Sequence, residues 1–146
     1  MGRLRRFLAH PPEERRLFVL ALPLVWVVRL GLWLFPVRTV RAGVERVARR
    51  LPGRPDPAPA EAARIAWAVG SASRFVPSAS CLTQAIAAEA LLRRRGHAAD
   101  LRFGVALDER GRLQAHAWIE SEGGVLLGDH DLERFTRLEP GRGRRG

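Results

Sequence analysis

The feature that most constrains the fold is an apolar run of about twenty residues, Phe18 to Val37. A run of this length is about long enough to cross a bilayer. Arg29 lies near its middle, and helix-disrupting residues interrupt it at Pro23, Gly31 and Pro36. The run is also too long for a signal peptide and lacks a small-x-small site after it. We therefore favour a buried or partner-facing helical hairpin, with association with a membrane surface and a true span as alternatives.

The segments on either side of this run set the domain boundaries. Pro11-Pro12-Glu13-Glu14 is typical of a helix start, and Arg38 to Leu51 predicts a short basic helix. A linker with four prolines follows at 51–60. We predict a basic and apolar helical extension over 1–59, a second domain over 60–139 and a disordered Arg/Gly tail over 140–146.

The second domain alternates from helices to strands. Ala60 to Phe75 predicts a helix, and CLTQAIAAEALLRRR predicts another, which begins at Cys81 and stops at Gly96. Its four alanines permit close approach to a sheet. Alternating or apolar runs then predict three strands, DLRFGVAL, LQAHAWIES and VLLGD. The fold class is therefore α+β: a helical extension, two helices and a small antiparallel sheet.

Composition removes several mechanisms and one class of partner. The net charge is +10, but all 25 basic residues are arginine, so we attribute the bias to genomic composition and expect no nucleic acid partner. Without lysine the chain has no Walker A loop, Schiff base or Ser–Lys dyad. The single cysteine excludes an internal disulfide and a zinc site built from several cysteines. Because asparagine is absent, a carboxylate or glutamine must complete any Cys–His pair.

Cys81 and His116 are the candidate nucleophile and base. With Ser80 as N-cap, the Cys81 thiol sits in a first helical turn, where free N–H groups and the helix dipole favour a thiolate and an oxyanion. His116 lies mid-strand, on the opposite face from Ala117 and Ile119. A lone cysteine is usually a small buried hydrophobe, and a strand histidine is usually structural. The order of helix-start cysteine and second-strand histidine nevertheless indicates a cysteine enzyme.

The third member depends on the register of the second hairpin. A Glu122-Gly123 turn places Asp129 opposite His116, whereas a Gly123-Gly124 turn places Asp131 there. We choose Asp129, because it directly ends the apolar run of its strand, and keep Asp131 as the alternative.

The other polar residues have less support as functional candidates. We expect His97 to be solvated after the Gly96 stop, and His10 belongs to the basic arm. Gln84, one turn after Cys81, is an oxyanion donor or a plain helix position. A zinc site from His97, His116, Asp129 and His130 has no supporting motif spacing, so no metal and no cofactor is expected.

The segment from Cys81 to Glu120 resembles the transglutaminase-like (papain-like) core of the B-type proteins of lasso peptide biosynthesis. The resemblance covers roughly residues 62 to 138. It is carried by Cys-Leu-x-x-Ala, Leu-Leu-Arg-Arg-x-Gly and His-Ala-Trp-x-Glu. The apolar and basic N-terminal segment is similar to a helical extension of that family. The chain resembles the split form, which has no leader-recognition domain of its own.

The resemblance implies an activity and its partners. The enzyme would cut the leader from a precursor peptide, with Cys81 as nucleophile, His116 as general base and acid, and Asp129 as the third member. A separate leader-recognition protein would present the precursor, and a lasso cyclase would use the freed amine. We expect a cytoplasmic protein, with membrane-surface association through 18–37 as the alternative.

Two rival functions remain open at this point. The same triad would also serve an acyltransferase or deamidase, because the second nucleophile depends on access to the pocket. Alternatively, the chain is a non-catalytic basic module that binds a membrane or nucleic acid and carries an inert cysteine.

Overall fold

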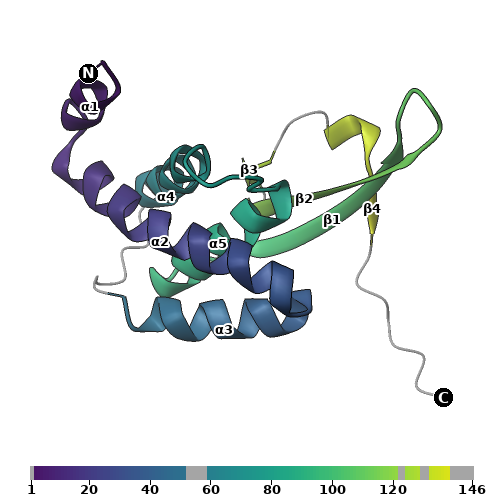
Figure 1. Cartoon of the computed structure of the whole chain (residues 1–146), viewed down its shortest axis with the longest axis horizontal. Coiled ribbons are helices and arrows are strands. Elements are labelled where there is room, and N and C mark those ends of the chain that lie inside the picture. Colours follow the sequence, from purple (N-terminus) through teal and green to yellow (C-terminus); the bar gives the residue numbers. More distant parts are fainter. Residues whose placement is uncertain (1, 52–58, 122–123, 129–131, 139–146) are drawn as a thin grey trace.

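The computed structural model describes residues 2–51, 59–121, 124–128 and 132–138, and it has the predicted α+β architecture (Figure 1). Its helices are α1 (Gly2–Leu8), α2 (Pro12–Leu34), α3 (Val37–Arg49), α4 (Pro59–Ser73), α5 (Cys81–Arg94) and the 3-10 helix η1 (Leu132–Arg134). Its strands are β1 (Asp100–Leu107), β2 (Leu113–Ser121), β3 (Gly124–Leu127) and β4 (Thr136–Leu138). They form one antiparallel sheet in the order β3-β2-β1-β4.

The apolar run forms most of α2, and the chain turns back into α3 after it. The helix begins at Pro12, as predicted, with Glu13 and Glu14 in a first turn whose dipole favours them. Pro23 lies inside α2 without ending it, and the break comes at Phe35-Pro36. The two arms of the resulting helical hairpin are therefore α2 and the basic α3, rather than two halves of the run itself.

One face of α2 is buried and the opposite face is exposed. The residues that face the core are Leu17, Ala21, Leu24, Val25 and Val28, at helical spacing. The apolar side chains that face outward are Val19, Trp26, Val27, Leu30, Trp33 and Leu34. Among the described helices, α2 alone is long and apolar enough to cross a membrane. Here it packs against α3, α4 and α5 as a core helix with one uncovered side.

Two buried carboxylates join the helices through arginine. Glu89 of α5 accepts two hydrogen bonds from Arg41 of α3, at 2.7 and 3.0 Å, and pairs with Arg93 at 3.3 Å. Glu61 of α4 pairs with Arg95 at 3.3 Å. Since Glu61 and Glu89 are both almost completely buried, these ion pairs are part of the packing between helices.

His97 corrects one prediction from the sequence, because it is buried rather than solvated. Helix α5 ends as predicted at Gly96, whose φ is +86°. The His97 N–H then bonds to the Leu92 carbonyl and the Gly96 N–H to the Arg93 carbonyl. This is a Schellman motif, in which the residue after the glycine folds back over the last turn. The solvated prediction was wrong because it took the end of the helix for the start of an exposed loop.

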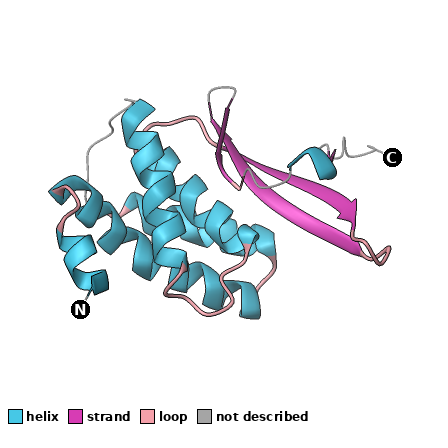
Figure 2. Ribbon diagram, turned by 90° about the horizontal axis from the view of Figure 1, so that it is seen from above, coloured by secondary structure: helices cyan, strands magenta, loops and turns pink. Residues whose placement is uncertain are grey.

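The sheet is half covered by the helices. Ala117 and Ile119 of β2 belong to the same core as α5 and α2, and the predicted alanine contact between α5 and the sheet is confirmed by their packing. The other end of the β1–β2 hairpin projects away from the helices (Figures 1 and 2). Leu107 and Leu113 near its tip are accordingly 64% and 71% exposed. Of the linker predicted over 51–60, residues 52–58 lie outside the described residues, and Pro59 and Ala60 begin α4. The predicted Arg/Gly tail over 140–146 also lies outside the described residues.

Candidate active site

The nucleophile candidate Cys81 is the first residue of α5, as predicted. Ser80 caps the helix: its backbone is extended, and its Oγ accepts a hydrogen bond from the Thr83 N–H at 3.2 Å. The Ser80 carbonyl accepts from the Gln84 N–H at 3.1 Å. These bonds satisfy the backbone N–H groups of Thr83 and Gln84. The N–H groups of Cys81 and Leu82 have no backbone acceptor within the described part of the chain. They are therefore available to an oxyanion next to the thiol.

The loop that delivers Cys81 is anchored to α2. Ser78 adopts a left-handed backbone conformation with φ of +59°, which a non-glycine residue seldom does. One residue earlier, the Pro77 carbonyl accepts a hydrogen bond from Arg29 Nε at 3.3 Å. Arg29 also lies over the Trp33 ring at 4.6 Å. Arg29, the charged residue in the middle of the apolar run, is thus held beside the loop that carries the candidate nucleophile.

His116 has a defined tautomer. Its Nε2 lies 2.7 Å from the carbonyl oxygen of Gly128. Because a carbonyl only accepts hydrogen bonds, Nε2 must carry the proton, and Nδ1 holds the free lone pair of a neutral imidazole. The nitrogen suited to act as a general base in this structure is therefore Nδ1.

Aromatic rings hold the imidazole on one face of the sheet. The Trp118 ring stacks near it, with centroids 6.0 Å apart and an interplanar angle of 24°, and the Phe135 ring lies 5.0 Å away. As predicted, this face is opposite to the one through which Ala117 and Ile119 pack into the core. Strand β2 leaves the core at this point, since Ala115 is exposed and Ala117 is buried.

The register of β3 begins as the chosen alternative predicts and then shifts. Ser121 pairs with Gly124 and Glu120 with Val125, the pairing of a Glu122-Gly123 turn. A β-bulge then moves the register by one residue, so that Ile119 pairs with Leu127. Nothing in the local sequence marks this bulge.

The triad prediction is only partly visible in the structure. Asp129, Asp131 and His130 lie outside the described residues, and the described residue that bonds to His116 is Gly128, directly before Asp129. Cys81 packs against the helical core, and no hydrogen bond joins its thiol to His116 within the described ranges. The structure does not bring the two side chains together, since Cys81 packs against the core that includes Ala117 and Ile119, whereas His116 lies on the other face of β2 beside Trp118 and Phe135. The assignment of Cys81, His116 and Asp129 stays a prediction.

The other candidate groups that the structure describes lie apart from one another. In the portion of the chain that the structure describes, no three histidine, cysteine or acidic side chains lie close enough to hold a metal ion. His10 lies elsewhere, hydrogen-bonded to Glu14 at 2.8 Å and close to the Trp67 ring. Gln84 is a half-buried position in α5.

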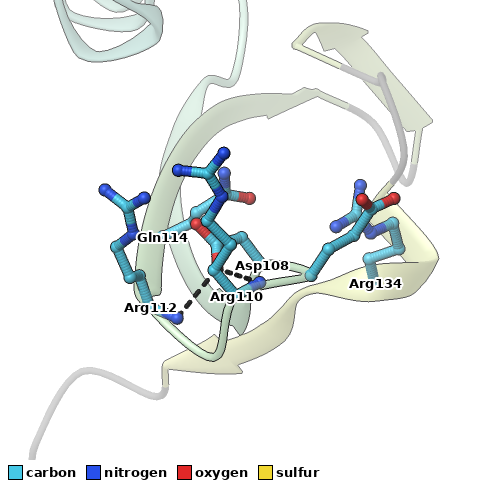
Figure 3. A pocket seen from close by; sticks show the side chains of 6 residues that line it. Asp108, Arg110, Arg112, Gln114 and Arg134 are labelled. Atoms are coloured by element: carbon cyan, nitrogen blue, oxygen red, sulfur yellow. Dashed lines mark hydrogen bonds between the residues drawn. The ribbon is translucent and has the colours of Figure 1, made fainter.

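An open hollow of about 430 Å³ lies at the tip of the β1–β2 hairpin (Figure 3). Its lining residues are Asp108, Glu109, Arg110, Arg112, Gln114 and Arg134. Asp108 Oδ1 accepts hydrogen bonds from the backbone N–H groups of Arg110 and Arg112, which closes the turn. None of the predicted site residues lines this hollow.

Glu120, to which the sequence alone assigned no role, lies on the same strand face as His116. Glu120 Oε1 accepts a hydrogen bond from Trp118 Nε1 at 3.0 Å, and Oε2 accepts from Arg137 at 3.1 Å and Arg102 at 3.4 Å. The pKa of Glu120 is held below its ordinary value of 4.5, chiefly by the Trp118 hydrogen bond. Arg137 and Arg102 lower this pKa further, while burial opposes them. The spacing of the His-Ala-Trp-x-Glu motif, which puts Glu120 on the same strand face as His116, was the sequence signal that could have identified it.

This lowered pKa predicts an acid-labile contribution to stability. The contribution is present above the pKa of an unfolded glutamate and is lost as the pH falls through the lower pKa of the folded state. Glu120→Gln has no such contribution to lose. Melting temperatures recorded from about pH 6 down to about pH 3 should therefore fall more steeply for the wild type than for Glu120→Gln. Parallel curves would contradict this prediction.

Comparison with known families adds one finding. The family model described as the transglutaminase-like superfamily matches residues 24–139. The matched part begins inside α2 and includes α3, α4, α5 and the whole sheet. No curated protein and no solved structure matches the chain.

Proposed function

Because the chain belongs to the transglutaminase-like superfamily, we propose that it is a cysteine peptidase that removes the leader from a lasso-peptide precursor. The family supports a papain-like cysteine enzyme in general. The observation that carries the proposal is the position of its single thiol, at the capped N-terminus of α5 with two first-turn N–H groups beside it. The leader-peptidase role is supported by the resemblance of the Cys-Leu-x-x-Ala and His-Ala-Trp-x-Glu motifs.

In the proposed reaction the Cys81 thiolate attacks the carbonyl carbon of the scissile peptide bond. The N–H groups of Cys81 and Leu82 stabilise the oxyanion, and the protonated His116 donates its proton to the leaving amine. The leader then remains as a thioester on Cys81. His116 next takes a proton from water, which attacks the thioester and releases the leader acid and the thiol.

The exposed side of α2 is the proposed contact for a partner. Its apolar side chains include Trp33 and Leu34, which are 72% and 75% exposed. An apolar surface of this kind is typical of an interaction site. The separate leader-recognition protein and the lasso cyclase are the proposed partners, with the surface of a membrane as the alternative and the cytoplasm as the proposed location.

The test is to incubate a precursor peptide with the enzyme and the recognition protein and to measure the product masses. Hydrolysis releases two peptides whose masses add up to the precursor plus one water. Loss of ammonia, or a cross-linked product, would instead assign the chain to the acyltransferases or deamidases that use the same nucleophile. An unchanged precursor under all these conditions would favour the non-catalytic module.

The third triad member has its own test. If Asp129 steers His116, Asp129→Asn should lower kcat by roughly 10²- to 10⁴-fold, while the melting temperature changes little. Asp131→Asn is the matched control, because it makes the same change two residues away. A severe loss in Asp131→Asn together with a harmless Asp129→Asn would show that Asp131 is the triad member.

A further inference from the structure

The outer face of β2 carries three side chains of the His-Ala-Trp-x-Glu motif in a row. Every second position of this part of β2 is occupied by one of them, His116, Trp118 and Glu120, so all three point to the same side of the sheet. The structure connects them in order, since Glu120 bonds to the Trp118 indole and the indole stacks on the His116 ring. We propose that Glu120 is a positioning residue that fixes the Trp118 indole and, through it, the orientation of the His116 imidazole.

Trp118 is fixed tightly enough to transmit a position. Trp118 is buried, with only 5% of the residue surface exposed. The six-membered ring lies on the backbone of Gly104 in β1, where an added Cβ would come within 2.9 Å of Cζ3 and 3.0 Å of Cη2. The N–H of the other ring points to Glu120. Gly104 and Glu120 therefore fix the two ends of the indole.

Glu120 is itself held from two neighbouring strands. Arg102 of β1 and Arg137 of β4 both reach its Oε2, while Oε1 remains for the indole N–H. The two arginines hold the carboxylate where Oε1 can accept from the indole N–H. A quarter of the Glu120 side chain remains exposed, so this support is shared with solvent.

The indole is one of three groups that surround the His116 ring. The hydrogen bond from Nε2 to Gly128 fixes one edge of the ring, and the centroid of the Phe135 ring lies 5.0 Å away. The imidazole turns only about its Cα–Cβ and Cβ–Cγ bonds, and a shift of the neighbouring indole would let it turn and so move Nδ1, the base nitrogen. The inference rests on the proposed function for the importance of Nδ1, but not for the contacts themselves.

The experiment separates the positioning role from activity by using two readouts. The first is the nitrogen NMR spectrum of His116 in Cys81→Ala protein, where no reaction occurs. We expect Glu120→Gln to change the nitrogen chemical shifts of His116, because the imidazole loses its fixed orientation relative to the Trp118 indole. The second is kinetics with intact Cys81, where kcat should fall roughly ten- to a hundredfold with KM nearly unchanged.

The matched control is Asp100→Asn. Asp100 pairs with Arg102 at 3.7 Å and is not among the groups that bond to Trp118 or stack on His116. The Asp100→Asn substitution removes a carboxylate from the same arginine and should leave both readouts unchanged. Trp118→Phe keeps an aromatic ring but loses the N–H, so adding Glu120→Gln to Trp118→Phe should cause little further change.

Several outcomes would overturn the inference. One is an unchanged His116 nitrogen spectrum in Glu120→Gln, and another is an equal change in Asp100→Asn. Full additivity of Glu120→Gln with Trp118→Phe would show that Glu120 does not act through the indole. If the wild-type enzyme cuts no precursor, the proposed function fails, while the NMR comparison still decides the positioning role.

Discussion

Replacement of Cys81 by alanine should abolish leader removal, with the rate falling by at least roughly 10⁴-fold. The chain contains no second cysteine that could take over as nucleophile. Alanine is the best helix former and occupies less space than cysteine, so α5 should keep its fold. The rate of leader release is measured by mass spectrometry, and folding is checked by circular dichroism and thermal melting.

Alkylation provides an independent version of the same test. Iodoacetamide can modify one thiol per chain, so one equivalent bound to Cys81 should inactivate the wild type as fully as the substitution does. Ser71→Ala in α4 is the control for substitution in a neighbouring helix and should process the precursor normally. If Cys81→Ala retains wild-type activity, the thiol is inert and the proposed mechanism is wrong.

Glu89→Ala should lower the free energy of unfolding by about 2–4 kcal/mol. The substitution removes both hydrogen bonds from Arg41 and the ion pair with Arg93, and it leaves a space in a buried position. It also loosens the contact between α3 and α5. Urea denaturation of the two proteins gives the difference directly.

Glu45→Ala is the matched control for this prediction. Glu45 in α3 also pairs with an arginine, Arg49, at 2.9 Å, but both side chains are substantially exposed. A pair of this kind contributes about 0.3–0.5 kcal/mol. Equal losses in Glu89→Ala and Glu45→Ala would show that burial of Glu89 adds nothing to its ion pairs.

Much of the fold follows from local sequence signals. Pro12 starts α2, Ser80 caps α5 and Gly96 ends it, because each position demands a residue of that backbone chemistry. Alternating apolar residues likewise predicted β1 and β2 with the bounds that the structure has. These signals act within a few residues, and so they can be recognised without knowing the tertiary structure.

The predictions that failed or fell short depend on contacts between distant segments. The prediction for His97 failed because a glycine stop marks the end of a helix without fixing the exposure of the residue after it, which is buried here. The bulge in β3 is a choice between registers that the residues of the turn do not dictate. The arginines that hold Glu89 come from α3 as well as from its own helix, which spacing along one helix cannot reveal.

The candidate site was predicted in the same uneven way. Cys81 was recognised by its place at a helix start and His116 by its place in the second strand, and the family match supports this class of enzyme. The sequence shows Glu120 only as the last residue of the His-Ala-Trp-x-Glu motif and does not reveal what it contacts. Its role depends on Arg102 and Arg137, which approach it from neighbouring strands once the register is known.

The bond from Arg29 to the Pro77 carbonyl has a thermodynamic consequence. It couples α2, which has an uncovered apolar side, to the segment that presents the sulfur. A molecule that docks on α2 and displaces Arg29 would change the affinity of the Cys81 loop for a ligand bound there. By linkage, a ligand at Cys81 would change the affinity of α2 for the docked molecule by the same factor.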